Sequence, residues 1–188
     1  MVYEDFDFLA FPYVKKFVQN WKRKVRKIKN DEKRYEFDKF ISHFIIYAAL
    51  VNVIKPQKEK VGKDRKYCTE VICDLLCNYS SNLNNLIKRI DISAKELGSV
   101  IITNNFSVLS SDGTTDPKLS ENWNSGNHQS MLLSLLQTLY FMRCNIFHGA
   151  KSFSEFQVRL LRPANKILSI VNEEIQNIYS TFEEEFQY

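Results

Sequence analysis

Arg143 and His148 are the side chains whose types and spacing best suit catalysis. They stand five residues apart in the stretch MRCNIFHGAK, residues 142–151, at the end of a leucine-rich run. An imidazole accepts and releases protons near neutral pH, and a guanidinium stays charged and offers donors that fit phosphate oxygens. The pair suits RNA cleavage: a base activates a 2′-hydroxyl to attack the neighbouring phosphate, and the guanidinium stabilises the developing charge. This chemistry requires no metal, so we expect no cofactor.

The spacing by itself leaves a structural role open for both residues. Five residues turn a helix by about 140° net, so the side chains converge only through the fraying helix end, the length of the arginine, or a second chain. Arg143 can instead pair with Glu173 or Glu174 in the last helix. His148 can cap the helix end, where the helix dipole favours a protonated imidazole. Gly149, directly after it, is well placed to end the helix.

Composition predicts a single all-α domain over residues 1–188. The hydrophobic fraction of 44% and the aromatic fraction of 13% supply a core and exclude a disordered chain. Only five glycines and four prolines interrupt the chain, and long uninterrupted segments favour helices. We expect an up-and-down bundle of four to five core helices within about residues 32–182, an extra N-terminal helix within residues 1–30, and a long polar loop. Apolar residues at three- and four-residue steps predict helices at residues 11–29, 32–54, 64–78, 80–91, 128–148 and 154–182.

The predicted helix at residues 11–29 is basic and amphipathic. Apolar residues recur on one face, and the other side carries Lys22, Arg23, Lys24 and Arg26. Such a face can bind an RNA backbone, and the net charge of +4 permits an anionic partner without requiring one. The same pattern also fits a solvated face, and both interpretations remain open at this point.

Three further segments carry local predictions. Ser93, with Glu96 three residues later, fits a capping box and predicts a short capped turn after the fourth helix. Residues 103–127 are rich in Asn, Ser, Thr, Asp and Gly, which predicts a long connection. Trp123 within it either anchors the loop or offers a stacking surface. Pro163 predicts a kink in the last helix or its division into two.

The cysteines and the remaining polar residues of the apolar helices have structural interpretations. Cys73 and Cys77 share a helix face, but no second Cys or His pair stands at the spacing of a zinc site, so we expect free thiols. His43 is expected to be a satisfied or partly exposed core histidine. Asn52 needs a hydrogen-bond partner if it is buried.

A cytoplasmic location is expected from two features. The stretch MVYEDFDFLAF at the start of the chain is acidic and aromatic and lacks the basic and apolar regions of a signal peptide. The most apolar stretch, at residues 40–54, is too short to span a bilayer comfortably. We therefore expect no membrane partner.

The stretch RCNIFHGAK, residues 143–151, resembles the R-x4–6-H motif of HEPN domains (higher eukaryotes and prokaryotes nucleotide-binding), often seen as RNxLFHGxK. FDKFISHFIIYAALVNVI, residues 37–54, is similar to the aromatic-rich helix that often opens such domains. FQVRLLRPANKILSIV, residues 156–171, is similar to the helix that follows the motif. The resemblance covers roughly residues 35–180, and its specific part is the block at residues 139–170.

The resemblance implies an all-α bundle and, for many members, a metal-independent ribonuclease of a toxin–antitoxin, CRISPR or phage-defence system. By position, Arg143 would bind phosphate and His148 would be the catalytic histidine. Lys151, unless merely solvated, and Asn145 would be further RNA contacts, and Cys144 stands where a polar residue is common. Such domains usually dimerise, so the expected partners are RNA, a second copy of the chain, and a separate antitoxin or defence protein. The alternative is a non-catalytic module that binds RNA, a nucleotide or a protein.

Overall fold

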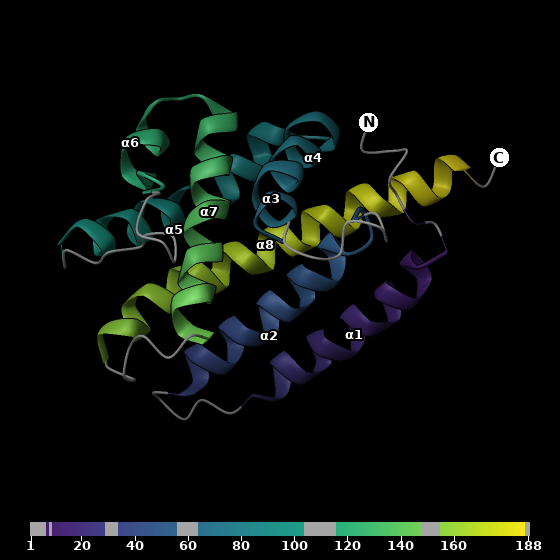
Figure 1. Ribbon diagram of the computed structural model, residues 1–188, viewed down its shortest axis with the longest axis horizontal. Helices are drawn as coiled ribbons and strands as arrows, with labels where there is room; N and C mark the ends of the chain where they lie inside the picture. The colour runs from purple at the N-terminus through teal and green to yellow at the C-terminus, as the bar shows by residue number, and fades with distance from the viewer. Residues whose placement is uncertain are drawn as a thin grey trace.

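The computed structural model describes Asp7 and residues 9–28, 34–55, 64–103, 116–147 and 155–186. These residues form helices and contain no β-strand, which confirms the all-α prediction (Figure 1). In chain order the elements are α1 (Phe11–Lys27), α2 (Arg34–Val51), α3 (Asp64–Lys66), the π-helical turn η2 (Tyr67–Val71), α4 (Ile72–Tyr79), α5 (Leu83–Thr103), α6 (Leu119–Asn124), α7 (His128–Phe147) and α8 (Glu155–Phe186).

The contact between α2 and α8 holds the bundle together, and the two helices run in the same direction (Figure 1). Three side chains of α8 donate hydrogen bonds to backbone carbonyls of α2, with seven-residue steps on both helices: Asn165 Nδ2 to Glu36 O at 2.8 Å, Asn172 Nδ2 to His43 O at 3.0 Å, and Tyr179 Oη to Leu50 O at 3.1 Å. Equal steps require parallel axes, and the heptad spacing resembles coiled-coil packing. On α8, the three hydrogen-bonding residues alternate with the apolar residues Leu161, Leu168, Ile175 and Phe182. We call these seven residues of α8 and their three partners on α2 the α2–α8 seam.

The basic helix predicted at residues 11–29 is confirmed as α1, which packs against α2 (Figure 1). Val18 is buried at the centre of its apolar face. Phe11 packs edge-on against Tyr179 of α8, with ring centroids 5.5 Å apart. Lys15 Nζ lies 3.3 Å from Glu183 Oε2 of α8. The N-terminal helix is therefore docked on both helices of the seam.

The third predicted helix runs without a break from α3 through η2 into α4. The π-turn places Thr69 fully inside, where its hydroxyl donates to the Arg65 carbonyl oxygen at 2.8 Å. The Cys68 carbonyl accepts a hydrogen bond from the Tyr47 hydroxyl of α2. Residues 80–82 separate α4 from α5, so the helices predicted at residues 64–78 and 80–91 are two distinct elements.

The capped turn predicted at Ser93 is wrong. α5 continues to Thr103, and Ser93 is buried in its middle. Leu86, Ile90 and Leu97 keep the helical period across the capping-box sequence, and α5 packs along α8. Burial of that continuous face outweighs the local capping preference.

The predicted loop at residues 103–127 is partly helical. α6 occupies its second half, whereas residues 104–115 lie outside the described residues. Trp123 on α6 is an anchor, since it is 3% exposed and its Nε1 donates to Asp91 Oδ1 of α5 at 2.9 Å. The indole therefore fixes α6 onto α5, and the stacking interpretation is wrong.

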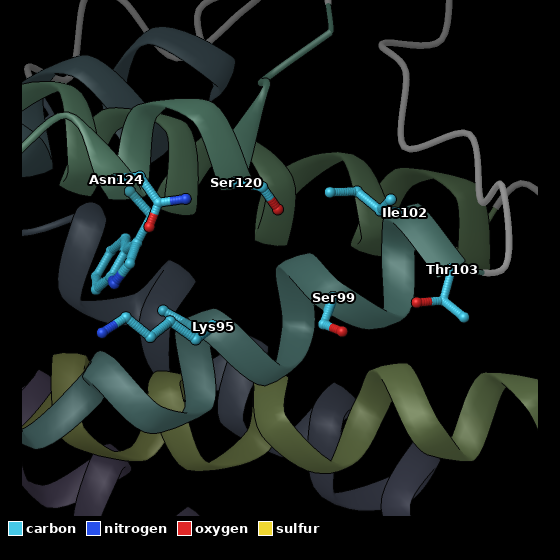
Figure 2. A pocket seen from close by; sticks show the side chains of 8 residues that line it. Lys95, Ser99, Ile102, Thr103, Ser120 and Asn124 are labelled. Atoms are coloured by element: carbon cyan, nitrogen blue, oxygen red, sulfur yellow. The ribbon is translucent and has the colours of Figure 1, made fainter.

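A cavity of about 330 Å³ lies between α5 and α6 beside this anchor (Figure 2). Lys95, Ser99 and Thr103 line it from α5, and Ser120 lines it from α6. The two helices approach closely at Gly98, where an added Cβ atom would lie 2.5 Å from Ser120 Oγ. A residue larger than glycine would force that hydroxyl to move.

Pro163 does not divide the last helix, because α8 is continuous from Glu155 to Phe186. Proline cannot donate the backbone hydrogen bond of its position, which disfavours a helix interior. Here Pro163 is buried, and Leu160, Leu161 and Ala164 around it are buried too. Packing of α8 against α2 and α5 therefore compensates for the missing hydrogen bond.

Candidate functional site

Arg143 lies one turn before the end of α7 and is half-buried. Its guanidinium carbon is 5.7 Å from the centre of the Phe44 ring of α2. Nη1 donates to Cys144 Sγ at 3.9 Å, and Nε is buried. An aromatic ring below a guanidinium orients it, and the in-plane donors of a guanidinium match the oxygens of a tetrahedral phosphate.

Two groups near Arg143, the Cys68 thiol and the Tyr140 hydroxyl, are neutral at physiological pH. Burial is the main cause that raises the pKa of the Cys68 thiol in η2 to about 12, and the charge of Arg143 acts against this shift. Burial also raises the pKa of the Tyr140 hydroxyl to about 12, with Cys144 as the next cause. A protonated thiol is a poor nucleophile, so Cys68 does not suit nucleophilic catalysis. The π-turn beside α7 is notable because such turns are frequent at functional sites.

His148 and Lys151 lie outside the described residues, as does Gly149. Asn145 is described and is half-buried in the last turn of α7. In the sequence, four residues separate His148 from Arg143, whose side chain packs on Phe44.

The two carboxylates of α8 that were expected as alternative partners of Arg143 contact other side chains. The Glu173 carboxylate pairs with Arg89 of α5. The Glu174 carboxylate accepts a hydrogen bond from the Ser80 hydroxyl. These contacts thus hold the first half of α5 and the C-terminal end of α4 against α8.

The four cations predicted on α1 point in different directions. Lys22 Nζ donates to Gln176 Oε1 of α8 at 3.1 Å, and Arg26 lies one turn further along the same flank. Lys24 Nζ lies 4.2 Å above the Trp21 ring, and Arg23 is exposed between the two flanks. Lys22 and Arg26 thus lie on the flank of α1 that faces α8, and Arg23 and Lys24 lie away from it.

Lys22 and Arg26 instead line a cleft of about 450 Å³ between α1, α2 and α8, together with Lys39, His43, Asn172 and Glu173. Burial, followed by the charges of Lys39 and Lys22, lowers the pKa of His43 from 6.5 to about 4. His43 is half-buried, as expected, and neutral at pH 7. We call this hollow the α1–α2–α8 cleft.

The sequence analysis missed Lys39 and the α2–α8 seam. The signal for the seam was present: apolar residues and Asn165, Asn172 and Tyr179 alternate at three- and four-residue steps from residue 161 to residue 182. Asn52, in contrast, is exposed, so the question of a buried partner does not arise.

All four cysteines are free thiols, as predicted, with Cys68 and Cys73 buried and Cys77 and Cys144 half-buried. In the described part of the chain, no group of three His, Cys, Asp or Glu side chains is arranged to hold a metal ion. No described helix combines the length and the apolar character needed to cross a membrane.

No protein-family model, curated protein or solved structure matches the chain. Function is therefore inferred from the residues themselves.

Proposed function

We propose that this protein is a HEPN-type, metal-independent endoribonuclease of a toxin–antitoxin or defence system. The observation that carries the proposal is the position of Arg143. It is held over Phe44 one turn before the end of α7, immediately ahead of the sequence NIFHGAK. The all-α fold, with a long helix after the motif, agrees with the resemblance.

The proposed reaction has two roles for these side chains. His148 accepts the proton of an RNA 2′-hydroxyl, whose oxygen attacks the adjacent phosphorus. The bond to the 5′-oxygen breaks, and this oxygen takes up a proton from water to become the 5′-hydroxyl. Arg143 binds the phosphate oxygens and stabilises their added charge. The products are a 2′,3′-cyclic phosphate, or its opened form, and a 5′-hydroxyl end. Asn145 and Lys151 add contacts to the RNA.

Two copies of the chain would form the working cleft, with Arg143 and His148 of each near the two-fold axis. This arrangement removes the spacing problem, because side chains about 140° apart on one helix can then converge from two helices. Sedimentation equilibrium gives the mass of the particle in solution. A strict monomer that still cleaves RNA would rule out the two-chain cleft.

A separate protein from the same toxin–antitoxin or defence system is the proposed regulator. Co-expression with the product of the neighbouring gene tests this, because an antitoxin would restore growth that the chain alone arrests.

The test of catalysis is expression of wild type, Arg143→Ala and His148→Ala, with growth and RNA integrity as readouts. Arg162→Ala is the matched control, since this exposed arginine lies on α8. We expect wild type and Arg162→Ala to arrest growth and degrade RNA, and the other two variants to do neither while remaining folded. If all four proteins degrade RNA equally, Arg143 and His148 have a structural role.

The metal-free mechanism has its own test. Purified protein should cleave RNA in EDTA at an undiminished rate and leave ends with a 2′,3′-cyclic phosphate or its opened form. Activity that disappears in EDTA and returns with a divalent metal would refute it.

The second candidate is a non-catalytic binding module for RNA, a nucleotide or a protein. The observation that favours it is the set of cations on α1. Charge reversal at Lys22, Arg23 and Lys24 would then abolish binding, and His148→Ala would leave every function intact.

A further inference from the structure

Positive charge exceeds negative charge in the α1–α2–α8 cleft, where three lysines and arginines and one carboxylate are among the lining residues. Among the described residues, Lys22 contacts the neutral amide of Gln176, and Lys39 Nζ lies 4.4 Å above the Tyr35 ring. The carboxylate that lines the cleft, Glu173, is engaged by Arg89. Together with Arg26, these two lysines give the cleft three cations that can bind an external anion.

A second hollow continues this charge along α2. It measures about 420 Å³, shares Lys39, His43 and Ser169 with the first, and is lined also by Arg89, Arg162 and Lys166. Its carboxylate, Glu36, already accepts from Asn165 Nδ2 at 2.8 Å and lies 3.5 Å from Arg162 Nε. Across both hollows, six lysines and arginines face two carboxylates.

The shape and the chemistry of the lining select the ligand. Guanidinium and ammonium groups suit phosphate oxygens, and a hollow of this volume is in the range of small-molecule sites. Lys39 stands at the junction of the two hollows, next to His43 one turn along α2. Anions placed in both hollows would therefore be bridged by one lysine.

We propose that the α1–α2–α8 cleft is a phosphate-binding site, in which Arg26 and Lys39 contact the phosphate oxygens. The site lies on a different stripe of α2 from Phe44, which contacts Arg143, and it shares no residue with the Arg143 site. Whether cleavage occurs at Arg143 and His148 does not affect this proposal. The phosphate can belong to a free phosphate compound or to a nucleic-acid backbone, and the probes below separate these sources.

Three probes are titrated into the full chain: inorganic phosphate, a short single-stranded uridine oligonucleotide with 2′-O-methyl ribose, and uridine without phosphate. The 2′-O-methyl group prevents cleavage by 2′-hydroxyl attack, so a binding result is independent of the proposed nuclease activity. The readout is the NMR titration of the His43 imidazole. A phosphate beside it should move its pKa upward from about 4, against the effects of burial, Lys39 and Lys22.

Arg26→Gln and Lys39→Gln are each expected to weaken phosphate binding about tenfold, because each removes one charge-assisted contact. Lys16→Gln is the matched control: it has the same charge change on the same helix, and this exposed lysine lies outside the cleft, so binding should weaken by less than about twofold. For the oligonucleotide, each cleft variant should reduce the slope of log affinity against log salt by about 0.7.

The outcomes assign or overturn the site. Binding of inorganic phosphate without tighter binding of the oligonucleotide supports a site for a free phosphate compound. Tighter oligonucleotide binding with the same dependence on Arg26 and Lys39 supports a nucleic-acid backbone. Equal losses in Lys16→Gln and Arg26→Gln, or no response of His43 to either phosphate probe, would overturn the proposal.

Discussion

Asn172 in the α2–α8 seam and Arg143 at the end of α7 both lie against α2, yet their surroundings differ. Asn172 is 1% exposed, and its amide donates to the His43 carbonyl at 3.0 Å. Arg143 is half-buried beside an aromatic ring and the Cys144 thiol, one turn before the end of α7. A long charged side chain kept partly open to solvent suits binding, whereas a fully enclosed amide fixes the position of two helices.

The comparison predicts that truncation in the seam has the largest effect on stability. Ile175→Ala should lower the free energy of unfolding by about 2–5 kcal/mol, because the side chain is fully buried between Asn172 and Tyr179 on α8. Ile92→Ala on α5, where the isoleucine is 78% exposed, is the matched control and should change it by less than about 0.5 kcal/mol. Urea denaturation of both variants measures the difference. Similar losses would show that the seam is not the centre of stability.

Acid should weaken the seam through His43. Its pKa falls from 6.5 to about 4 on folding, so the unfolded chain binds the proton more tightly between these values. Stability is therefore fully present above pH 6.5 and is lost as pH falls toward 4, by up to about 3 kcal/mol. His43→Gln should flatten the pH dependence of the melting temperature in this window. His128→Gln is the control, and an unchanged slope in His43→Gln would contradict the prediction.

Arg143→Ala should cost the fold about 1 kcal/mol, which corresponds to the loss of a half-buried stacking contact. The same substitution should abolish the proposed RNA cleavage. Chemical denaturation and the RNA assay are read on the same sample. A loss of stability as large as that of Ile175→Ala would place Arg143 with the seam and remove the contrast between the two regions.

The two kinds of seam hydrogen bond should differ in the smallest effects. Tyr179→Phe removes the donor to the Leu50 carbonyl near the end of α2 and should cost about 1 kcal/mol. Asn172→Leu should leave stability unchanged or raise it. The Oδ1 atom of Asn172 is buried and has no hydrogen-bond partner among the described residues. Leucine is of similar size to asparagine, and the substitution removes this unsatisfied acceptor. A loss above about 1 kcal/mol for Asn172→Leu would mean that its hydrogen bond to α2 outweighs that cost.

Predictions from the sequence succeeded where periodicity is strong. Val14, Val18, Trp21 and Val25 mark one face of α1 at three- and four-residue steps, and the helix lies where they place it. The prediction at Ser93 failed because capping preferences are local, whereas α5 is held along α8 by a buried face that extends past this residue. α6 was missed because a helix of six residues with two apolar positions, Leu119 and Trp123, is too short to show a periodic pattern. In addition, Trp123 reaches its partner Asp91 thirty-two residues earlier in the chain.

The sequence by itself determined the helical class, most helix positions and the motif that contains Arg143 and His148. These follow from short-range patterns: apolar spacing, the scarcity of glycine and proline, and residue types within ten positions. Only the tertiary structure decided that α2 and α8 run parallel, and that Lys22 and Arg26 share a cleft with Lys39 while Arg23 and Lys24 do not. The physical reason is that helix direction and the partner of each helix face are set by burial between segments more than a hundred residues apart, which no local spacing encodes.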